Sequence, residues 1–223
     1  MKHLIVAAHP DDEILGCGGI INQLKKKGLD SYVLILTGGA ETRYAKDMEV
    51  VLKNNAYEAN KLVGTKEVFF EALPNQQLDT IPLLKIIQAI EKYIAEIKPE
   101  IVFTHHGGDL NKDHRLVYEA TITATRPIIG QMVKRIYSYY VPSSTEWNFI
   151  EGDKVFIPNV YIDIKEEVDT KIQAMSCYAS ECRPYPHPRS PEAIKAYAHY
   201  WGITVGMEYA EPMKLIRDNS GAI

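Results

Sequence analysis

The feature that most constrains the fold is a regular alternation of short apolar runs and longer amphipathic segments through residues 1–140. Short continuous apolar runs are typical of buried strands, whereas apolar residues spaced three or four positions apart are typical of helices. Strands separated by helices in this way form βαβ units, in which a crossover helix joins two parallel strands. The pattern therefore predicts an α/β fold with a doubly wound, mostly parallel sheet flanked by helices.

Element boundaries are expected where the apolar pattern stops or where glycine and proline end a helix. The first five strands are expected at residues 4–8, 31–37, 68–70, 101–104 and 135–140. The helices between them are expected at residues 14–27, 48–63, 82–97 and 113–126. The remainder is less regular, with a strand at 159–164, helices at 166–177 and 192–205, and a loop rich in proline and charge at 182–191. Because no linker or repeat interrupts the chain, we expect one domain over residues 1–223 with a C-terminal elaboration from about residue 160.

Charge and composition argue against several classes of protein. The net charge is −4, and no basic run is interleaved with aromatic residues, so a nucleic-acid partner is not expected. No apolar stretch approaches the ~18–20 residues that span a bilayer, and the N-terminal segment lacks the regions of a signal peptide. Cys17, Cys177 and Cys182 have no CxxC spacing and are typical of reduced thiols. We therefore expect a cytoplasmic protein without a membrane span.

The segment HPDDEI at residues 9–14 directly follows the first expected strand. Polar groups at the carboxyl end of a parallel strand project into the crevice where ligands bind. His9 and Asp12, three positions apart, can converge on one cation and leave Asp11 free beside it. The alternative is that these residues only cap the start of a helix, because Pro10 and acidic residues both favour a first helical turn. A helix cap does not account for a histidine at the strand end. The segment therefore favours one turn that supplies both metal ligands and a general base.

A second polar loop follows the fourth expected strand, with the sequence HHGGDLNKDHR at residues 105–115. In a doubly wound sheet this strand end can lie near the first one, at the same carboxyl edge. Two ligands from one loop and one from another, with a position left for water, is the pattern of catalytic rather than structural zinc. Two nitrogens and one oxygen suit zinc, although iron(II), cobalt or manganese also bind such a site.

The glycines of Gly16-Cys17-Gly18-Gly19 offer a competing interpretation as a dinucleotide-binding loop. In that fingerprint the glycines lie at the turn, where bare backbone meets the pyrophosphate at the helix N-terminus. Here the turn carries three acidic residues, whose charge repels a phosphate and attracts a cation. The glycines fall one turn into the helix, where we expect them to allow close packing on the sheet. A dinucleotide-dependent dehydrogenase is therefore disfavoured.

Several segments together resemble the PIG-L/LmbE family of metal-dependent N-deacetylases. The specific one is AHPDDE at residues 8–13, and the resemblance extends over most of the chain through TGG at 37–39, LPNQQLDT at 73–80, GDLNKDHR at 108–115 and PHPRSPEAI at 186–194. The resemblance implies a Rossmann-like sandwich and a zinc ion held by His9, Asp12 and His114. It implies Asp11 as the general base, an N-acetylated amino sugar as substrate, and a homo-oligomer.

One departure from the family concerns the third ligand. Many relatives have His-Pro-Asp-His there, and the first histidine is proposed to stabilise the intermediate or to protonate the leaving group. This chain has Asn111-Lys112-Asp113-His114, and asparagine cannot transfer a proton. The role must pass to Asp11 alone, to His187, or to His105 or His106, or else be absent. Asp113 is expected either to orient a ligand histidine or to cap the helix that begins there.

Further candidates lie in expected loops, where each is as compatible with a turn or a solvated charge as with binding of a substrate. His187 and Arg189 match the family's C-terminal segment, which closes the pocket in relatives. The candidates for contacts with a sugar or an anionic group are Arg43, Asp79, Asp109, His187 and Arg189.

The leading hypothesis is a zinc hydrolase that removes acetyl from a free, nucleotide-linked or glycan-precursor amino sugar. A metal would activate water and polarise the acetyl oxygen, while Asp11 takes the proton of the attacking water and returns it to the amine. The alternatives are a non-catalytic, metal-stabilised carbohydrate-binding protein, which the asparagine at position 111 motivates, and a related amidase that acts on a thiol-sugar conjugate.

Overall fold

The structure, a computed structural model, describes residues 1–38, 48–149 and 152–221. Within these ranges seven strands form one sheet in the order β3-β2-β1-β4-β5-β7-β6. The first five strands in the chain are parallel to one another, and β7 is antiparallel to β5 and to β6. Their bounds are β1 Lys2–Ala7, β2 Asp30–Thr37, β3 Glu67–Leu73, β4 Ile101–Thr104, β5 Arg135–Tyr139, β6 Val160–Asp163 and β7 Ala210–Asp218.

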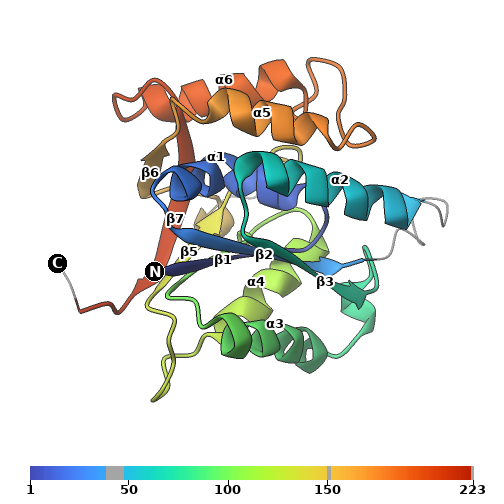
Figure 1. Cartoon of the computed structure of the whole chain (residues 1–223), viewed down its shortest axis with the longest axis vertical. Coiled ribbons are helices and arrows are strands. Elements are labelled where there is room, and N and C mark those ends of the chain that lie inside the picture. Colours follow the sequence, from blue (N-terminus) through green and yellow to red (C-terminus); the bar gives the residue numbers. More distant parts are fainter. Residues whose placement is uncertain (39–47, 150–151, 222–223) are drawn as a thin grey trace.

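Helices cover both faces of this sheet, as Figure 1 shows. One face packs against α1 and α2, with α5 lying on these two helices and α6 lying beside α5 and against β7, and the other face packs against α3 and α4. The expected doubly wound α/β sandwich is confirmed. No helix in the described ranges is long and apolar enough to cross a membrane. The bounds are α1 Asp12–Lys26, α2 Met48–Val63, η1 Leu78–Thr80, α3 Leu83–Ile97, α4 Lys112–Ala124, η2 Gly152–Lys154, α5 Val168–Ser176 and α6 Pro191–Ile203.

The local sequence explains most of these elements. β1 is buried from His3 onwards because both of its faces are covered, and such strands have continuous apolar sequences. In α3 the buried positions include Ile86, Ile90 and Ile97, which form one apolar stripe at helical spacing. This helix ends at Lys98, whose left-handed backbone is followed by Pro99.

The order of the strands determines where a ligand can bind. The chain passes from β1 outward to β2 and β3, then returns to place β4 on the other side of β1. β1 and β4 therefore flank a topological switch point, where the loops after the strands diverge and leave a crevice. The segments that follow β1 and β4 are HPDDEI at residues 9–14 and HHGGDLNKDHR at residues 105–115.

The glycines in α1 permit close contacts with neighbouring elements. A side chain at Gly16 would overlap the ring of Tyr139 in β5, which confirms the expected packing on the sheet. A side chain at Gly19 would instead meet Ile164 and the carboxylate of Glu211 in β7, which accepts the Gly19 N–H at 2.8 Å. Lys171 of α5 donates to Leu15 O at 2.8 Å and to Glu211 at 2.7 Å. The buried ion pair of Lys171 and Glu211 thus forms hydrogen bonds with backbone N–H and C=O groups of α1 beside its glycines.

Strand β7 was absent from the sequence-based expectation, which identified no element after residue 205. It lies between β5 and β6 and completes the sheet. Two residues obscure it: Pro212, which pairs with Tyr161 of β6 but lies just outside the register with β5, and the buried charge of Glu211. Proline argues against a strand in the sequence, although it is tolerated where one side of the strand is unpaired, as Pro212 is on the β5 side.

Candidate metal centre

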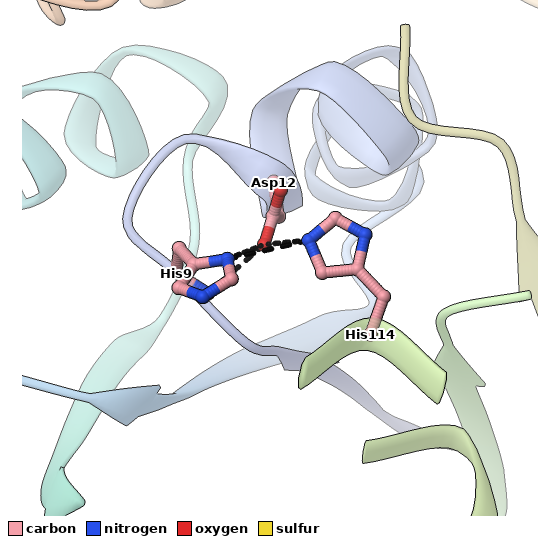
Figure 2. A group of neighbouring side chains, drawn as sticks. All are labelled: His9, Asp12 and His114. Carbon is pink, nitrogen blue, oxygen red and sulfur yellow. Dashed lines mark hydrogen bonds and ion pairs between the residues drawn. The ribbon is translucent and has the colours of Figure 1, made fainter. Parts of the chain in front are cut away.

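His9, Asp12 and His114 meet at the carboxyl edge of the sheet. His9 follows β1, Asp12 begins α1, and His114 lies in the first turn of α4, so the topology brings together residues about a hundred positions apart. Figure 2 shows the two imidazoles converging on the Asp12 carboxylate. All three residues are buried, and their ligand atoms lie within 4.8 Å of one another.

The spacing of the three inner atoms fits a metal ion. His9 Nδ1 and His114 Nε2 are 3.2 Å apart, and each lies 3.3 Å from Asp12 Oδ2. Ligand atoms bound tetrahedrally to zinc at ~2.0–2.1 Å lie roughly 3.3 Å from one another. Asp12 Oδ1 is buried and has no hydrogen-bond partner among the described residues. The donor set and its spacing are therefore those of a two-histidine, one-carboxylate metal site.

Each imidazole of the candidate site contacts a further carboxylate. His9 Nε2 lies 3.1 Å from Asp113 Oδ2, and His114 Nδ1 lies 3.2 Å from Asp109 Oδ1. When these outer nitrogens carry the hydrogens, the lone pairs of the inner nitrogens face the common point. Carboxylates behind ligand histidines fix the tautomer and raise ligand basicity. The site thus has supporting acids on both sides.

The site is electrostatically suited to a cation. Burial alone would raise the pKa of Asp12, but the imidazoles of His114 and His105 lower it well below the ordinary value. For His114, burial alone would lower the pKa, but the carboxylates of Asp12 and Asp109 outweigh burial and raise the pKa to about 10. The buried carboxylates therefore favour positive charge on the imidazoles, and a metal ion bound there would replace the imidazole protons.

Asp11 stands beside the ligands without joining them. Its φ of 109° lies in a region that L-residues rarely adopt. The Arg189 guanidinium donates to Asp11 Oδ2 at 2.6 Å, and both residues line the same cavity. Burial raises the pKa of Asp11 above its ordinary value, and Arg189 opposes that rise. The structure thus keeps the Asp11 carboxylate apart from the cluster of His9, Asp12 and His114.

Comparison with known proteins identifies the family. The sequence model of the PIG-L family, described as GlcNAc-PI de-N-acetylase, matches residues 4–125, which is more than half of the chain. The chain belongs to the PIG-L family. The uncharacterized deacetylase YaiS of Escherichia coli strain K12 is 29% identical over 184 residues, which cover 79% of this chain and 90% of YaiS.

Two further matches cover more of the chain than the PIG-L model does. Diacetylchitobiose deacetylase of Thermococcus kodakarensis is 24% identical over 231 residues, covering 96% of this chain and 83% of that protein. The crystal structure of the conserved protein TT1542 from Thermus thermophilus has a TM-score of 0.77 and 26% identity, covering 95% and 93% of the two chains. The likeness therefore extends beyond the part that the PIG-L model matches.

Asn111, where many PIG-L relatives have histidine, caps helix α4. Its Oδ1 accepts the Asp113 N–H at 2.9 Å, and its Nδ2 donates to Gln76 Oε1 at 3.3 Å. Asp113, the other candidate cap, instead contacts His9 and accepts the Leu78 N–H at 3.1 Å. Of the two roles expected for Asp113, the structure places it in the orienting one.

Asp109 lies behind His114 and is fully buried, so its carboxylate does not face the cavity. It accepts from Ser144 Oγ at 2.5 Å and from Thr145 Oγ1 at 2.7 Å. His114 and these hydroxyls outweigh burial and lower the pKa of Asp109 to about 2. The sequence analysis missed Ser144 and Thr145, although a run of hydroxyl residues a few positions after a strand is a usable signal.

The cavity beside the cluster has a volume of about 450 Å³. Asp79 lines it and accepts from Lys112 Nζ at 2.9 Å. Arg189, also in its wall, lies 3.2 Å from Glu181, a partner that sequence reasoning missed. Arg43 lies outside the described residues.

Of the three imidazoles considered for the absent family histidine, His187 lines the cavity. Its Nδ1 accepts the Arg189 N–H at 3.1 Å, and its ring meets Trp147 edge-on at 5.6 Å. His105 is fully buried beneath His114, where its Nε2 accepts the Ala8 N–H. His106, also buried, contacts a backbone oxygen, Lys154 O, at 2.8 Å. Neither His105 nor His106 is among the residues that line the cavity.

Proposed function

We propose that this PIG-L protein is a metal-dependent N-deacetylase that hydrolyses the acetamide of an N-acetylated amino sugar. The observation that carries the proposal is the separation of carboxylates at one strand end. Asp12 converges with His9 and His114, while Asp11 lies outside that cluster and lines the cavity. This arrangement provides both a metal site and a base at the same place.

Each group has a role in the proposed reaction. Zinc, which suits two nitrogens and one oxygen, would supply a Lewis acid that activates water and polarises the acetyl oxygen. Asp11 accepts a proton from the attacking water as the new carbon–oxygen bond forms. It returns that proton to the nitrogen as the carbon–nitrogen bond breaks, so the products are acetate and a free amine.

Proton return to the amine rests on Asp11 because Asn111 caps a helix and cannot transfer a proton. His187 supports the reaction in another way. Since its Nδ1 accepts a hydrogen bond from Arg189 N, the neutral ring carries its hydrogen on Nε2. A neutral imidazole with that tautomer, in the cavity wall, is a donor suited to the oxyanion of the tetrahedral intermediate.

The substrate class is supported by the relatives and by the chemistry of the cavity. The PIG-L model and the Thermococcus relative are both described by deacetylation of N-acetylglucosamine-containing compounds. Amide and hydroxyl groups of Gln76, Asn111 and Ser143 line the cavity. Such groups both donate and accept hydrogen bonds, as recognition of sugar hydroxyls requires.

The test is acetate release by chelator-treated protein before and after zinc is restored. The panel contains N-acetylglucosamine, N,N′-diacetylchitobiose, nucleotide-linked N-acetylglucosamine and an N-acetylated thiol-sugar conjugate. We expect zinc-dependent acetate release that His114→Gln abolishes and the matched control His106→Gln retains, since His106 is buried outside the cluster. Tight binding of a sugar without acetate release would refute the proposal in favour of a carbohydrate-binding protein. Turnover confined to the thiol conjugate would indicate the related amidase.

A further inference from the structure

Glu13 is the acidic residue of the 9–14 segment that the proposed reaction does not use. It is fully buried, yet both of its carboxylate oxygens are engaged. Oε2 accepts the Asp11 N–H at 3.0 Å, and Oε1 accepts from Asn60 Nδ2 at 2.8 Å and from the Tyr178 hydroxyl. Three donors from separate parts of the chain thus converge on one carboxylate, whereas an acid that merely favours a helix start stays solvated.

The Asp11 backbone is the part of this arrangement that needs support. At φ 109° and ψ −30° this residue departs from the usual extended conformation of a helix N-cap. Its carbonyl accepts from Ile14 N at 3.1 Å and Leu15 N at 2.9 Å, while its N–H points to Glu13. A strained conformation persists only where its surroundings over-determine it, and Glu13 supplies the contact on the N–H side.

We propose that Glu13 is a positioning residue that holds Asp11 in the conformation that directs its carboxylate toward Arg189 and the cavity. The proposal rests on the proposed function, in which Asp11 is the base. Asn60 in α2 and Tyr178 after α5 fix the other oxygen, so the position of Asp11 depends on helices packed on the same face of the sheet. Glu13 contacts Asp11 and none of the three metal ligands by the hydrogen bonds described above.

The decisive variant is Glu13→Gln, which keeps the size of the side chain. It replaces one accepting oxygen by an N–H₂ group, which cannot accept the hydrogen bonds that Asp11, Asn60 and Tyr178 donate. The matched control is Glu211→Gln, because Glu211 is also buried and also accepts backbone N–H groups of α1, at Gly19 and Ile20. Zinc affinity by chelator competition, thermal midpoint, kcat and KM are measured for both variants. Tyr178→Phe, which removes one donor and leaves the bond to Asp11, serves as a milder second variant.

We expect Glu13→Gln to lower kcat about ten- to hundredfold, the range typical of lost supporting contacts, with KM and zinc affinity within about threefold of wild type. Tyr178→Phe should lower kcat by a smaller factor in the same pattern. Glu211→Gln should lower the thermal midpoint at least as much as Glu13→Gln and leave kcat within about threefold. If Glu13→Gln fails to fold, the Tyr178→Phe result decides.

Three results would overturn the positioning role. They are an unchanged kcat, an equal loss of kcat in the Glu211 control, and a loss of zinc affinity that accounts for the loss of activity. If wild type releases no acetate, the proposed function fails, and crystal structures of wild type and Glu13→Gln then judge the inference separately. An Asp11 φ that stays positive in the variant would overturn it, and a relaxed φ would support it.

Discussion

Replacing Lys171 by methionine removes one partner of the ion pair that enters the ladder of α1. Lys171 is 6% exposed and Glu211 is 1% exposed, and they lie 2.7 Å apart. The substitution leaves Glu211 buried with two backbone N–H contacts, to Gly19 and Ile20, but without a counter-ion. Breaking a buried pair in this way costs about 3–5 kcal/mol. For a chain of this length that corresponds to a fall in thermal midpoint of roughly 10 °C.

The assay is urea unfolding of the metal-free protein followed by circular dichroism, so that metal binding does not contribute to stability. The double variant Lys171→Met/Glu211→Gln removes the charge as well as its partner. It should be more stable than the sum of the two single losses predicts, because the residues interact directly. A loss below about 1 kcal/mol for Lys171→Met would refute the buried-pair reasoning.

Three further predictions concern a carboxylate behind His114, the cap of α4 and a buried histidine in β1. Asp109→Asn removes the charge behind His114 and should weaken zinc affinity about ten- to hundredfold in a chelator competition; unchanged affinity would contradict the orienting role. Asn111→Ala should lower the free energy of unfolding by about 1 kcal/mol in urea, because α4 loses its cap, and a neutral effect would speak against capping. His3→Gln should flatten the acid side of the pH–stability curve. Burial lowers the pKa of His3 below 6.5, so the unfolded chain binds the proton more readily and stability falls as pH drops below that value. An unchanged slope below pH 6.5 would contradict this.

The meeting of the two polar segments at one sheet edge was predictable because its information is local, whereas the choice of His114 within the second segment came from the resemblance to the PIG-L family. His9 and Asp12 directly follow a strand that its apolar run reveals, and His114 follows another strand whose end lies at the same edge. Parallel strands joined by crossovers place their carboxyl ends together, so the topology itself brings the two segments together. Helices such as α3 were predictable for the same reason, since the apolar stripe of α3 is visible in its own sequence.

The supporting residues were not predictable because they depend on contacts distant in sequence. The sequence shows an acid at Glu13 but not that Tyr178 reaches it across 165 positions. It shows Asp109 in a glycine-rich loop but not that residues after β5 bury it behind a ligand. The strand containing Pro212 was hidden because proline argues against a strand, and the sequence does not show that Pro212 pairs with β6 alone, outside the register with β5.

The central claim is that Asp11 is the base beside a metal held by His9, Asp12 and His114. The most direct test is kcat for acetate release by Asp11→Asn, with zinc content measured on the same sample and Asp79→Asn as a control carboxylate of the same cavity. The account predicts full zinc content, a fall in kcat of about 10²–10⁴-fold for Asp11→Asn, and a small effect for Asp79→Asn. Near-wild-type kcat in zinc-loaded Asp11→Asn would contradict it.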